Sequence, residues 1–447
     1  MADERNSLRR RLKRYADVTT SVGGAAARMA GARVMGRERN ARSEAAELKS
    51  ILGNLKGPLM KVAQMLASVP DALPSDFAAE LSTLQTQAPP MGWPFVRRRM
   101  SAELGPDWEK KFKTFERAAA AAASLGQVHR AWDKRGRALA CKLQYPDMAS
   151  AVEADLSQLK LMFAVYRRMD RAIDPSEIAD EVGARLREEL DYRREAAHIR
   201  LYRAMLKDIP TIHVPDVIDD LSTGRLLTMS WEEGRPILEF KERPLADRNK
   251  IATSLFKAWW HPFSHYATIH GDPHLGNYQI RDDLALNLLD YGCIRTFKPK
   301  FVGGVIDLYR ALERGDKALA VHAYETWGFV GLKKDVIETL NIWARFIYAP
   351  LLDNRVRTVA NGVEPSAYGR KEAAEVHKRL SQLGPVKPPR EFVFMDRAAI
   401  GLGAVFLHLQ AELNFYKLFN DEIENFALPT VAKRQKAAFE AAGVPLP

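Results

Sequence analysis

The pattern of apolar positions along the chain predicts long helices interrupted by a few short strands. The runs 139–143 and 226–229 are apolar over strand-like lengths, so each is expected to form a β-strand. The tract 149–206 predicts a long helix with a cluster of carboxylates near its end. The run 398–411 contains His408 and falls short of the roughly 20 residues of a membrane span, so we expect a buried helix there and no membrane span.

Proline, glycine and polar positions divide the chain into three predicted domains. Residues 1–90 are mostly helical and end at a proline-bearing break, which predicts a helical N-terminal extension. Residues 91–232 mix helix and strand, whereas residues 233–447 are mostly helical around the polar segment 269–292. The turn-rich stretch 353–389 is expected to hold a loop. These domains predict an α+β protein that is predominantly helical.

Composition and charge narrow the class of protein without choosing a ligand. The 447 residues are 47% hydrophobic, which predicts packed domains, and two cysteines exclude a disulfide framework. The net charge of +11 predicts attraction to anions such as nucleotides and anionic lipids. The basic segment 5–14 fits either a helix on an anionic membrane surface or a solvated arm, and no secretory signal is expected. A nucleic-acid partner is supported by the net charge and by no other feature of the sequence, so we do not expect one.

The polar segment carries the chemistry that the sequence indicates most strongly. Asp272 and Asn277 lie five positions apart, and Asp290 follows the apolar run 284–289 and precedes an aromatic residue and a glycine. Phosphoryl transfer from ATP uses one carboxylate to orient the acceptor, and an amide oxygen and a second carboxylate to hold Mg²⁺. Kinases supply these groups in this order and spacing. We therefore predict that Asp272 orients the acceptor and that Asn277 and Asp290 bind the metal.

Kinases also carry a lysine and a phosphate loop upstream of these groups. Lys142 lies in a strand-like run and matches the lysine that contacts the α- and β-phosphates. Six alanines, 118–123, stand where a glycine-rich loop is usual, and taken alone they fit a loop or a helix start. Candidates for the glutamate that pairs with the lysine are Glu188, Glu189 and Glu195, although their spacing also fits a solvated helix.

Together these motifs resemble the UbiB/AarF family of atypical protein-kinase-like enzymes, over about residues 50–420. The family's alanine-rich loop is matched by 121–131 and its H-x-D-P-H-x-G-N catalytic loop by 270–277. Its Glu-x-Asp motif is matched by Glu189-Leu190-Asp191. Its Lys-x-Gly-Gln motif is matched by Lys61-Val62-Ala63-Gln64, in which alanine replaces the glycine.

The resemblance implies a two-lobed protein-kinase-like fold, with the helical extension packed across the lobes and ATP or ADP bound with Mg²⁺ in the cleft. The phosphates would lie against Ala121, Ala122, Ala123 and Ser124, and adenine would meet a hinge at Ser230, Trp231 and Glu232.

Further site residues are implied by the same resemblance. Lys142 would pair with Glu195, which matches the family's helix glutamate, and Glu189 and Asp191 would add carboxylates to the metal site. From the extension, Lys61 and Gln64 would reach into the cleft.

At the level of function, the resemblance implies an ATPase that supports ubiquinone (coenzyme Q) biosynthesis or isoprenoid-lipid handling. Its partners would be a lipid or quinone precursor and biosynthetic proteins, in the cytoplasm or at the inner face of the membrane; homodimer formation stays open. Two alternatives stay open as well. A true kinase of a protein or small molecule needs an open acceptor groove, and a non-catalytic nucleotide-gated lipid adaptor needs binding without turnover.

Four histidines around the catalytic loop resemble a zinc site only superficially. His261, His265, His270 and His274 follow one another at steps of four, five and four. The last two are explained by the catalytic loop, and no cysteine or acidic ligand accompanies the four in metalloprotease spacing. We therefore expect no zinc site.

Overall fold

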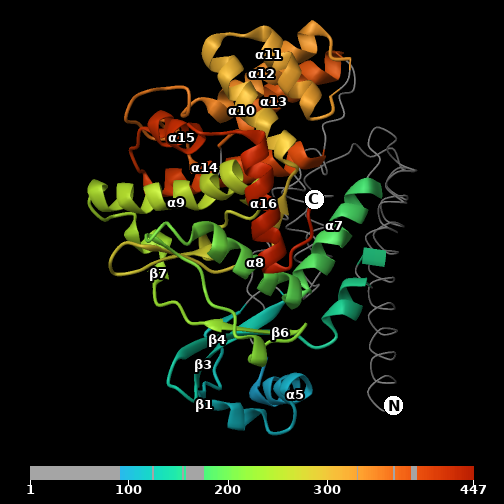
Figure 1. Ribbon diagram of the computed structural model, residues 1–447, viewed down its shortest axis with the longest axis vertical. Coiled ribbons are helices and arrows are strands. Elements are labelled where there is room, and N and C mark those ends of the chain that lie inside the picture. The colour runs from blue at the N-terminus through green and yellow to red at the C-terminus, as the bar shows by residue number, and fades with distance from the viewer. Residues whose placement is uncertain are drawn as a thin grey trace, which may run out of the picture. The chain divides into compact units, whose positions relative to one another are not determined.

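The computed structural model describes residues 91–122, 125–153, 156–157, 176–329, 331–365, 368–383 and 390–447 (Figure 1). Two compact units emerge, one of residues up to Arg193 with 218–229, the other of 194–217 with 230–447. The predicted extension 1–90, with Lys61 and Gln64, lies outside the described residues.

The first unit is built on a five-stranded sheet in the order β1-β3-β4-β6, with β2 paired to β3. Its strands are β1 Phe112–Phe115, β2 Ala121–Ala122, β3 Gly126–Asp133, β4 Ala138–Gln144 and β6 Leu226–Ser230. The predicted strands at 139–143 and 226–229 are therefore confirmed. The helical alternative for the alanine run is wrong, because Ala121 and Ala122 pair with β3 as a strand.

The helices of the first unit are α5 Trp93–Leu104 and α7 Ser176–Glu189, together with the 3-10 helices η1 Trp108–Lys111 and η2 Asp219–Leu221. Pro94 in the first turn of α5 starts the helix without losing a hydrogen bond. Val96 and Met100, one turn apart, bury against Trp108 and Phe112, which places α5 on the core face of the sheet.

The single helix expected over 149–206 is wrong at its carboxylate cluster. Helix α7 ends at Glu189, and α8 Tyr192–Leu206 begins after a turn. The Asp191 side chain accepts a hydrogen bond from the backbone of Arg193 at 3.1 Å, the bond of a helix N-cap. The Glu-x-Asp motif therefore runs from the last residue of α7 through a turn to the N-cap of α8, so its carboxylates do not lie on one continuous helix.

The second unit is mainly helical. Besides α8, its helices are α9 Leu245–Tyr266, α10 Pro299–Arg314, α11 Lys317–Thr326, α12 Lys334–Tyr348, α13 Arg370–Leu383, α14 Arg390–Leu409, α15 Phe415–Ile423 and α16 Leu428–Ala442. Helix α9 packs against α14, α15 and α16 (Figure 1). Within α9, Leu255, Phe256, Trp259 and Phe263 are buried at helical spacing.

Two expectations for the helical region are confirmed. The buried helix expected at 398–411 is part of α14, and the stretch 353–389 holds a loop in its described residues 353–365 and 368–369, before α13 begins. Among the helices of the described ranges, none is long and apolar enough to cross a membrane.

Short strands in the second unit position the polar segment. One sheet has the order β5-β10-β9-β7, and a second pairs β8 with β11. The strands are β5 Ile212–His213, β7 Arg235–Pro236, β8 Thr268–His270, β9 Tyr278–Ile280, β10 Leu286–Leu288 and β11 Ile294–Thr296, with 3-10 helices η3 Ile237–Phe240 and η4 Leu275–Asn277. The predicted catalytic loop therefore connects β8 to β9, and the predicted metal aspartate follows β10.

Candidate active site

The catalytic loop is fastened to the segment after β10 by a buried histidine. His270 is 3% exposed, and its Nε2 donates to the backbone carbonyl of Asp290 at 2.6 Å. A carbonyl can only accept, so the proton must lie on Nε2. The antiparallel pairing of Ile294 with His270 joins the same two segments from the other side.

Asn277 is oriented by the aspartate five positions before it. Its Nδ2 donates to the backbone carbonyl of Asp272 at 2.8 Å, while its backbone amide donates to His274 at 2.9 Å. Because the amide nitrogen is committed to this bond, the Asn277 oxygen is the atom that can bind a cation. The turn thus gives Asp272 and Asn277 fixed relative positions.

Asp290 is held next to Asn277 by the backbone. The amide of Leu289 donates to the Asn277 carbonyl at 3.1 Å, and Asp290 Oδ1 accepts from the amide of Gly292 at 2.9 Å. These bonds bring the backbone segments that carry Asp272, Asn277 and Asp290 together. Their donors are carboxylate and amide oxygens, the set that Mg²⁺ prefers, so these residues fit that ion.

Helix α8 supplies a further support that the sequence did not reveal. His198 Nδ1 donates to the carbonyl of Tyr291 at 3.1 Å, one residue beyond Asp290. The Tyr291 ring packs on Tyr202 with centroids 5.5 Å apart, and burial holds the pKa of both phenols well above the usual range. Glu195, in the first turn of the helix, is 2% exposed. Of these residues of α8, only Glu195 was predicted from the sequence as a site residue, because no motif or spacing rule indicates a role for His198.

Lys142 lies on the sheet of the first unit beside the Glu-x-Asp motif. Strand pairing places it opposite Val128. Its Nζ lies 5.4 Å from the centre of the Tyr192 ring, a distance suited to a cation–π contact, and Tyr192 directly follows Asp191. The first unit therefore brings together the predicted phosphate lysine and one end of the predicted Glu-x-Asp motif.

The alanine-rich loop forms an edge of the same sheet. Ala121 pairs with Val128 and Ala122 with Gln127, while Ala123 and Ser124 lie outside the described residues. Two residues beyond Ser124 lies Gly126, where an added Cβ would approach the Leu143 carbonyl oxygen to 2.4 Å. A hydrogen is thus the side chain that fits at Gly126.

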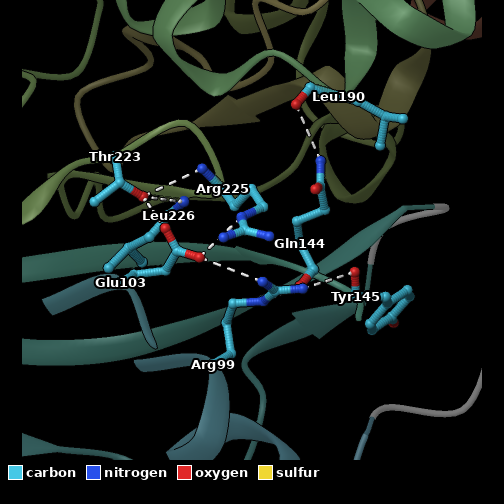
Figure 2. Close-up of polar contacts among 8 residues, drawn as sticks. All are labelled: Arg99, Glu103, Gln144, Tyr145, Leu190, Thr223, Arg225 and Leu226. Atoms are coloured by element: carbon cyan, nitrogen blue, oxygen red, sulfur yellow. Dashed lines mark hydrogen bonds and ion pairs between the residues drawn. The ribbon is translucent and has the colours of Figure 1, made fainter. Parts of the chain in front are cut away.

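A buried polar network supports the end of β4, two residues beyond Lys142 (Figure 2). Arg99 of α5 donates to the carbonyls of Gln144 and Tyr145 at 3.1 and 3.2 Å. The Gln144 side chain donates to the carbonyl of Leu190, inside the Glu-x-Asp motif, at 3.0 Å. The strand that carries Lys142 and the turn that carries the carboxylates are therefore fixed to one another.

Glu103 connects the network to the turn before β6, as Figure 2 shows. Its carboxylate lies 3.3 Å from Arg99 and 3.0 Å from Arg225, and it accepts from the Thr223 hydroxyl at 2.7 Å. Burial is the largest influence on Arg99 and lowers the pKa of its guanidinium. These residues lie far from the motifs in sequence, so no spacing rule could have found them.

Replacing Arg99 with methionine should lower the free energy of unfolding of the first unit by about 1–3 kcal/mol, because two buried carbonyls lose their donor. The matched control is Arg137→Met, whose arginine is 58% exposed and pairs with Asp133; it should cost less than about 1 kcal/mol. Denaturant unfolding of the full chain measures both. Equal costs for the two variants would contradict a supporting role for the Arg99 network.

The predicted adenine hinge is partly engaged in backbone contacts. The Ser230 amide donates to Asp216 at 2.8 Å, and its hydroxyl accepts from the Asp216 amide and donates to Glu232. Glu232 also pairs with Arg281 at 3.2 Å. Adenine would therefore have to meet backbone groups other than the Ser230 amide, at Trp231 or beyond.

Some predicted relations stay predictions. Lys142 belongs to the first unit and Glu195 to the second, so their pairing is untested. The reach of Lys61 and Gln64 into the site concerns residues outside those described.

Comparison with known proteins supplies the family. The profile of the ABC1 atypical kinase-like domain matches residues 83–324. The mitochondrial atypical kinase coq-8 of Caenorhabditis elegans is 28% identical over 403 residues, covering 86% of this chain and 51% of that protein. The mitochondrial atypical kinase COQ8 of Saccharomyces cerevisiae is 28% identical over 250 residues, which cover 56% of this chain and 50% of that protein. The chain thus spans about half the length of these curated relatives.

A solved structure agrees with this assignment. The Mycobacterium tuberculosis protein Rv3197, determined in complex with erythromycin, has a TM-score of 0.60 and 27% identity, covering 89% of this chain and 99% of that chain. The profile match spans more than half of the sequence, and the predicted kinase-like α+β fold is confirmed. The chain belongs to the ABC1 atypical kinase-like family, the UbiB/AarF group that its motifs resemble.

Proposed function

We propose that this protein binds Mg²⁺-ATP and cleaves its terminal phosphate in support of ubiquinone biosynthesis. The observation that carries the proposal is the turn in which Asn277 donates to the carbonyl of Asp272 while its own carbonyl accepts from Leu289. The turn holds Asp272 and Asn277, and with Asp290 after β10 they follow the order of groups that phosphoryl transfer by kinases uses, which supports the proposal. The relatives named as atypical kinases support the same class of reaction.

The residues of the candidate site have separate roles in the proposal. Asn277 and Asp290 hold Mg²⁺, which when bound neutralises charge on the phosphates. Asp272 orients the nucleophile, a water or a small polar group, and accepts its proton as the new bond to the γ-phosphorus forms and the bond to the departing ADP breaks. His270 and His198 act as positioning residues, since both donate to backbone carbonyls of the segment that carries Asp290.

Residues of the first unit complete the proposal. Lys142 neutralises the α- and β-phosphates and pairs with Glu195. The edge formed by Ala121 and Ala122 lies over the phosphates together with Ala123 and Ser124, and Glu189 and Asp191 add carboxylates near the metal. Adenine meets the hinge at Trp231 and Glu232, and Lys61 and Gln64 close the site from the extension.

The proposal for the acceptor and the location is supported by the net charge and by the family. A chain of net charge +11 is attracted to anionic lipid surfaces, where ubiquinone precursors are dissolved. We therefore propose peripheral attachment to a membrane and coupling of ATP hydrolysis to a lipid or phenolic precursor. Biosynthetic proteins would be the macromolecular partners.

ATP turnover by the purified full-length chain tests this function. The assay contains Mg²⁺ and compares buffer alone, anionic liposomes, and liposomes with a phenolic quinone-precursor mimic. The proposal predicts turnover that rises with the lipid or the phenol. Turnover that stays at the level of buffer in every arm, despite Mg²⁺-dependent ATP binding, would instead support a nucleotide-gated adaptor or a kinase whose acceptor is missing.

A further inference from the structure

Three side chains able to bind a metal converge where the last turns of α9 meet α15. His261 and His265 lie four residues apart on α9, and their rings stack with centroids 4.1 Å apart. Glu422 approaches from α15, and ligand atoms of all three residues lie within 4.8 Å of one another. Among the described residues, no other group of three histidine, cysteine or acidic side chains has its ligand atoms this close together.

The distances suit one small divalent ion. Glu422 Oε2 lies 3.1 Å from His261 Nδ1 and 3.6 Å from His265 Nδ1. Bonds of about 2.0–2.1 Å in tetrahedral geometry place neighbouring ligand atoms roughly 3.3 Å apart, between the two observed values. The 3.6 Å separation is too long for a hydrogen bond, so the carboxylate faces two imidazoles and bonds directly to only one.

The packing of the two helices holds these ligands in place without a metal. The Trp260 ring packs edge-to-face against Phe419 with ring centroids 4.7 Å apart, and the Phe256 ring packs against Phe415 with centroids 6.2 Å apart. The carboxylate of Glu422 is 11% exposed and each histidine side chain is 24% exposed. The site is therefore largely enclosed by protein yet open to an ion from solvent, as a preformed metal site requires.

One competing contact exists, because the Ser264 hydroxyl lies 2.8 Å from His265 Nδ1 and would have to give way or turn to a metal-bound water.

We propose that His261, His265 and Glu422 bind one divalent transition-metal ion of the zinc class, with water or a small anion in the remaining position. Two imidazoles and a carboxylate are ligands that zinc accepts, whereas the Asp290 site offers only oxygen and suits magnesium. The ion would link α9 to α15, and its ligand His265 lies three residues before the start of β8, which leads into the catalytic loop. The site is structural and independent of the proposed ATP chemistry.

Zinc binding to the full-length chain tests the site directly. The experiment uses the Asp290→Asn variant without nucleotide, so that zinc binding at the proposed magnesium site is minimised. We compare that chain with versions that also carry Glu422→Gln or His265→Asn, using zinc titration against a competing chelator. The control is His322→Asn, which removes an exposed histidine from α11. One zinc ion should bind per chain, and each ligand variant should weaken binding at least about tenfold, whereas the control should not.

Two further readouts separate a metal site from a simple histidine–carboxylate contact. Cobalt(II) should give the visible absorption bands of a four-coordinate ion in the parent chain, and each ligand variant should lose them. Zinc should raise the melting temperature of the parent chain but not of the ligand variants, all of which are first melted in chelator to establish that they fold. Zinc affinity and cobalt spectra unchanged in both ligand variants would overturn the proposal.

Discussion

Replacing Asp290 with asparagine is expected to lower Mg²⁺-ATP turnover by at least about a thousandfold, the scale on which phosphoryl transfer depends on its charge-neutralising groups. The substitution removes one negative charge from the proposed metal site. It keeps an oxygen that can accept from the Gly292 amide, so the turn should persist. Stability should therefore change little while turnover is lost, as steady-state phosphate release and thermal melting would measure.

Asp282→Asn is the matched control for this experiment. Asp282 lies in the same unit, between β9 and β10, and its side chain is fully exposed. The control makes the same chemical change without touching the proposed metal site, so its turnover should equal that of the parent chain. Retention of more than about a tenth of parental turnover by Asp290→Asn would remove Asp290 from the proposed metal-binding role.

Replacing Gly126 with alanine is expected to destabilise the first unit by about 2–3 kcal/mol, because a rigid core cannot accept the new methyl group. The added Cβ would approach the Leu143 carbonyl oxygen to 2.4 Å and the Tyr192 hydroxyl to 2.8 Å. The first contact is with backbone, so relief requires the paired strands β3 and β4 to separate. Lys142 lies on the strand that would move.

The thiol of Cys141 reports this effect within the first unit. It is fully buried on β4, and burial raises its pKa to about 12, so it should not react with alkylating reagents in the native state. Opening of the sheet exposes it, so a loss of about 2–3 kcal/mol should accelerate its labelling by roughly thirtyfold to 150-fold. Peptide mass analysis distinguishes Cys141 from Cys293.

Gly224→Ala serves as the control, since nothing lies within 4 Å of the position where its Cβ would stand. Its labelling rate should stay within about twofold of the parent chain. If Gly126→Ala also stayed within twofold, the close packing of β3 against β4 at this position would be contradicted.

The sequence predicted the parts of the site that depend on short spacing. Asp272 and Asn277 are joined by a turn of six residues, so their distance along the chain determines their geometry. The strands that carry Lys142 and the hinge were visible because short apolar runs between turns favour strands. The family motifs then extended these local predictions to the whole fold, which the solved relative supports.

The sequence could not predict contacts between distant segments. Arg99 reaches Gln144 across 45 positions, and Glu422 meets His261 across 161, so neither pair leaves a periodic signal. Glu422 on α15 lies far from the two histidines in sequence, so histidine spacing alone does not reveal that these three residues converge. The break between α7 and α8 was missed because Leu190 and Asp191 continue an apparently helical pattern.

The magnesium dependence of ATP affinity tests the central claim most directly. Calorimetric titration of the full-length chain with ATP is performed in Mg²⁺ and in chelator, for the parent chain and for Asn277→Ala. Because Asn277 and Asp290 would hold Mg²⁺, which would neutralise charge on the phosphates, Mg²⁺ should tighten ATP binding at least about tenfold in the parent and much less in the variant. Equal affinity with and without Mg²⁺ in the parent chain would contradict the proposed Mg²⁺-ATP site.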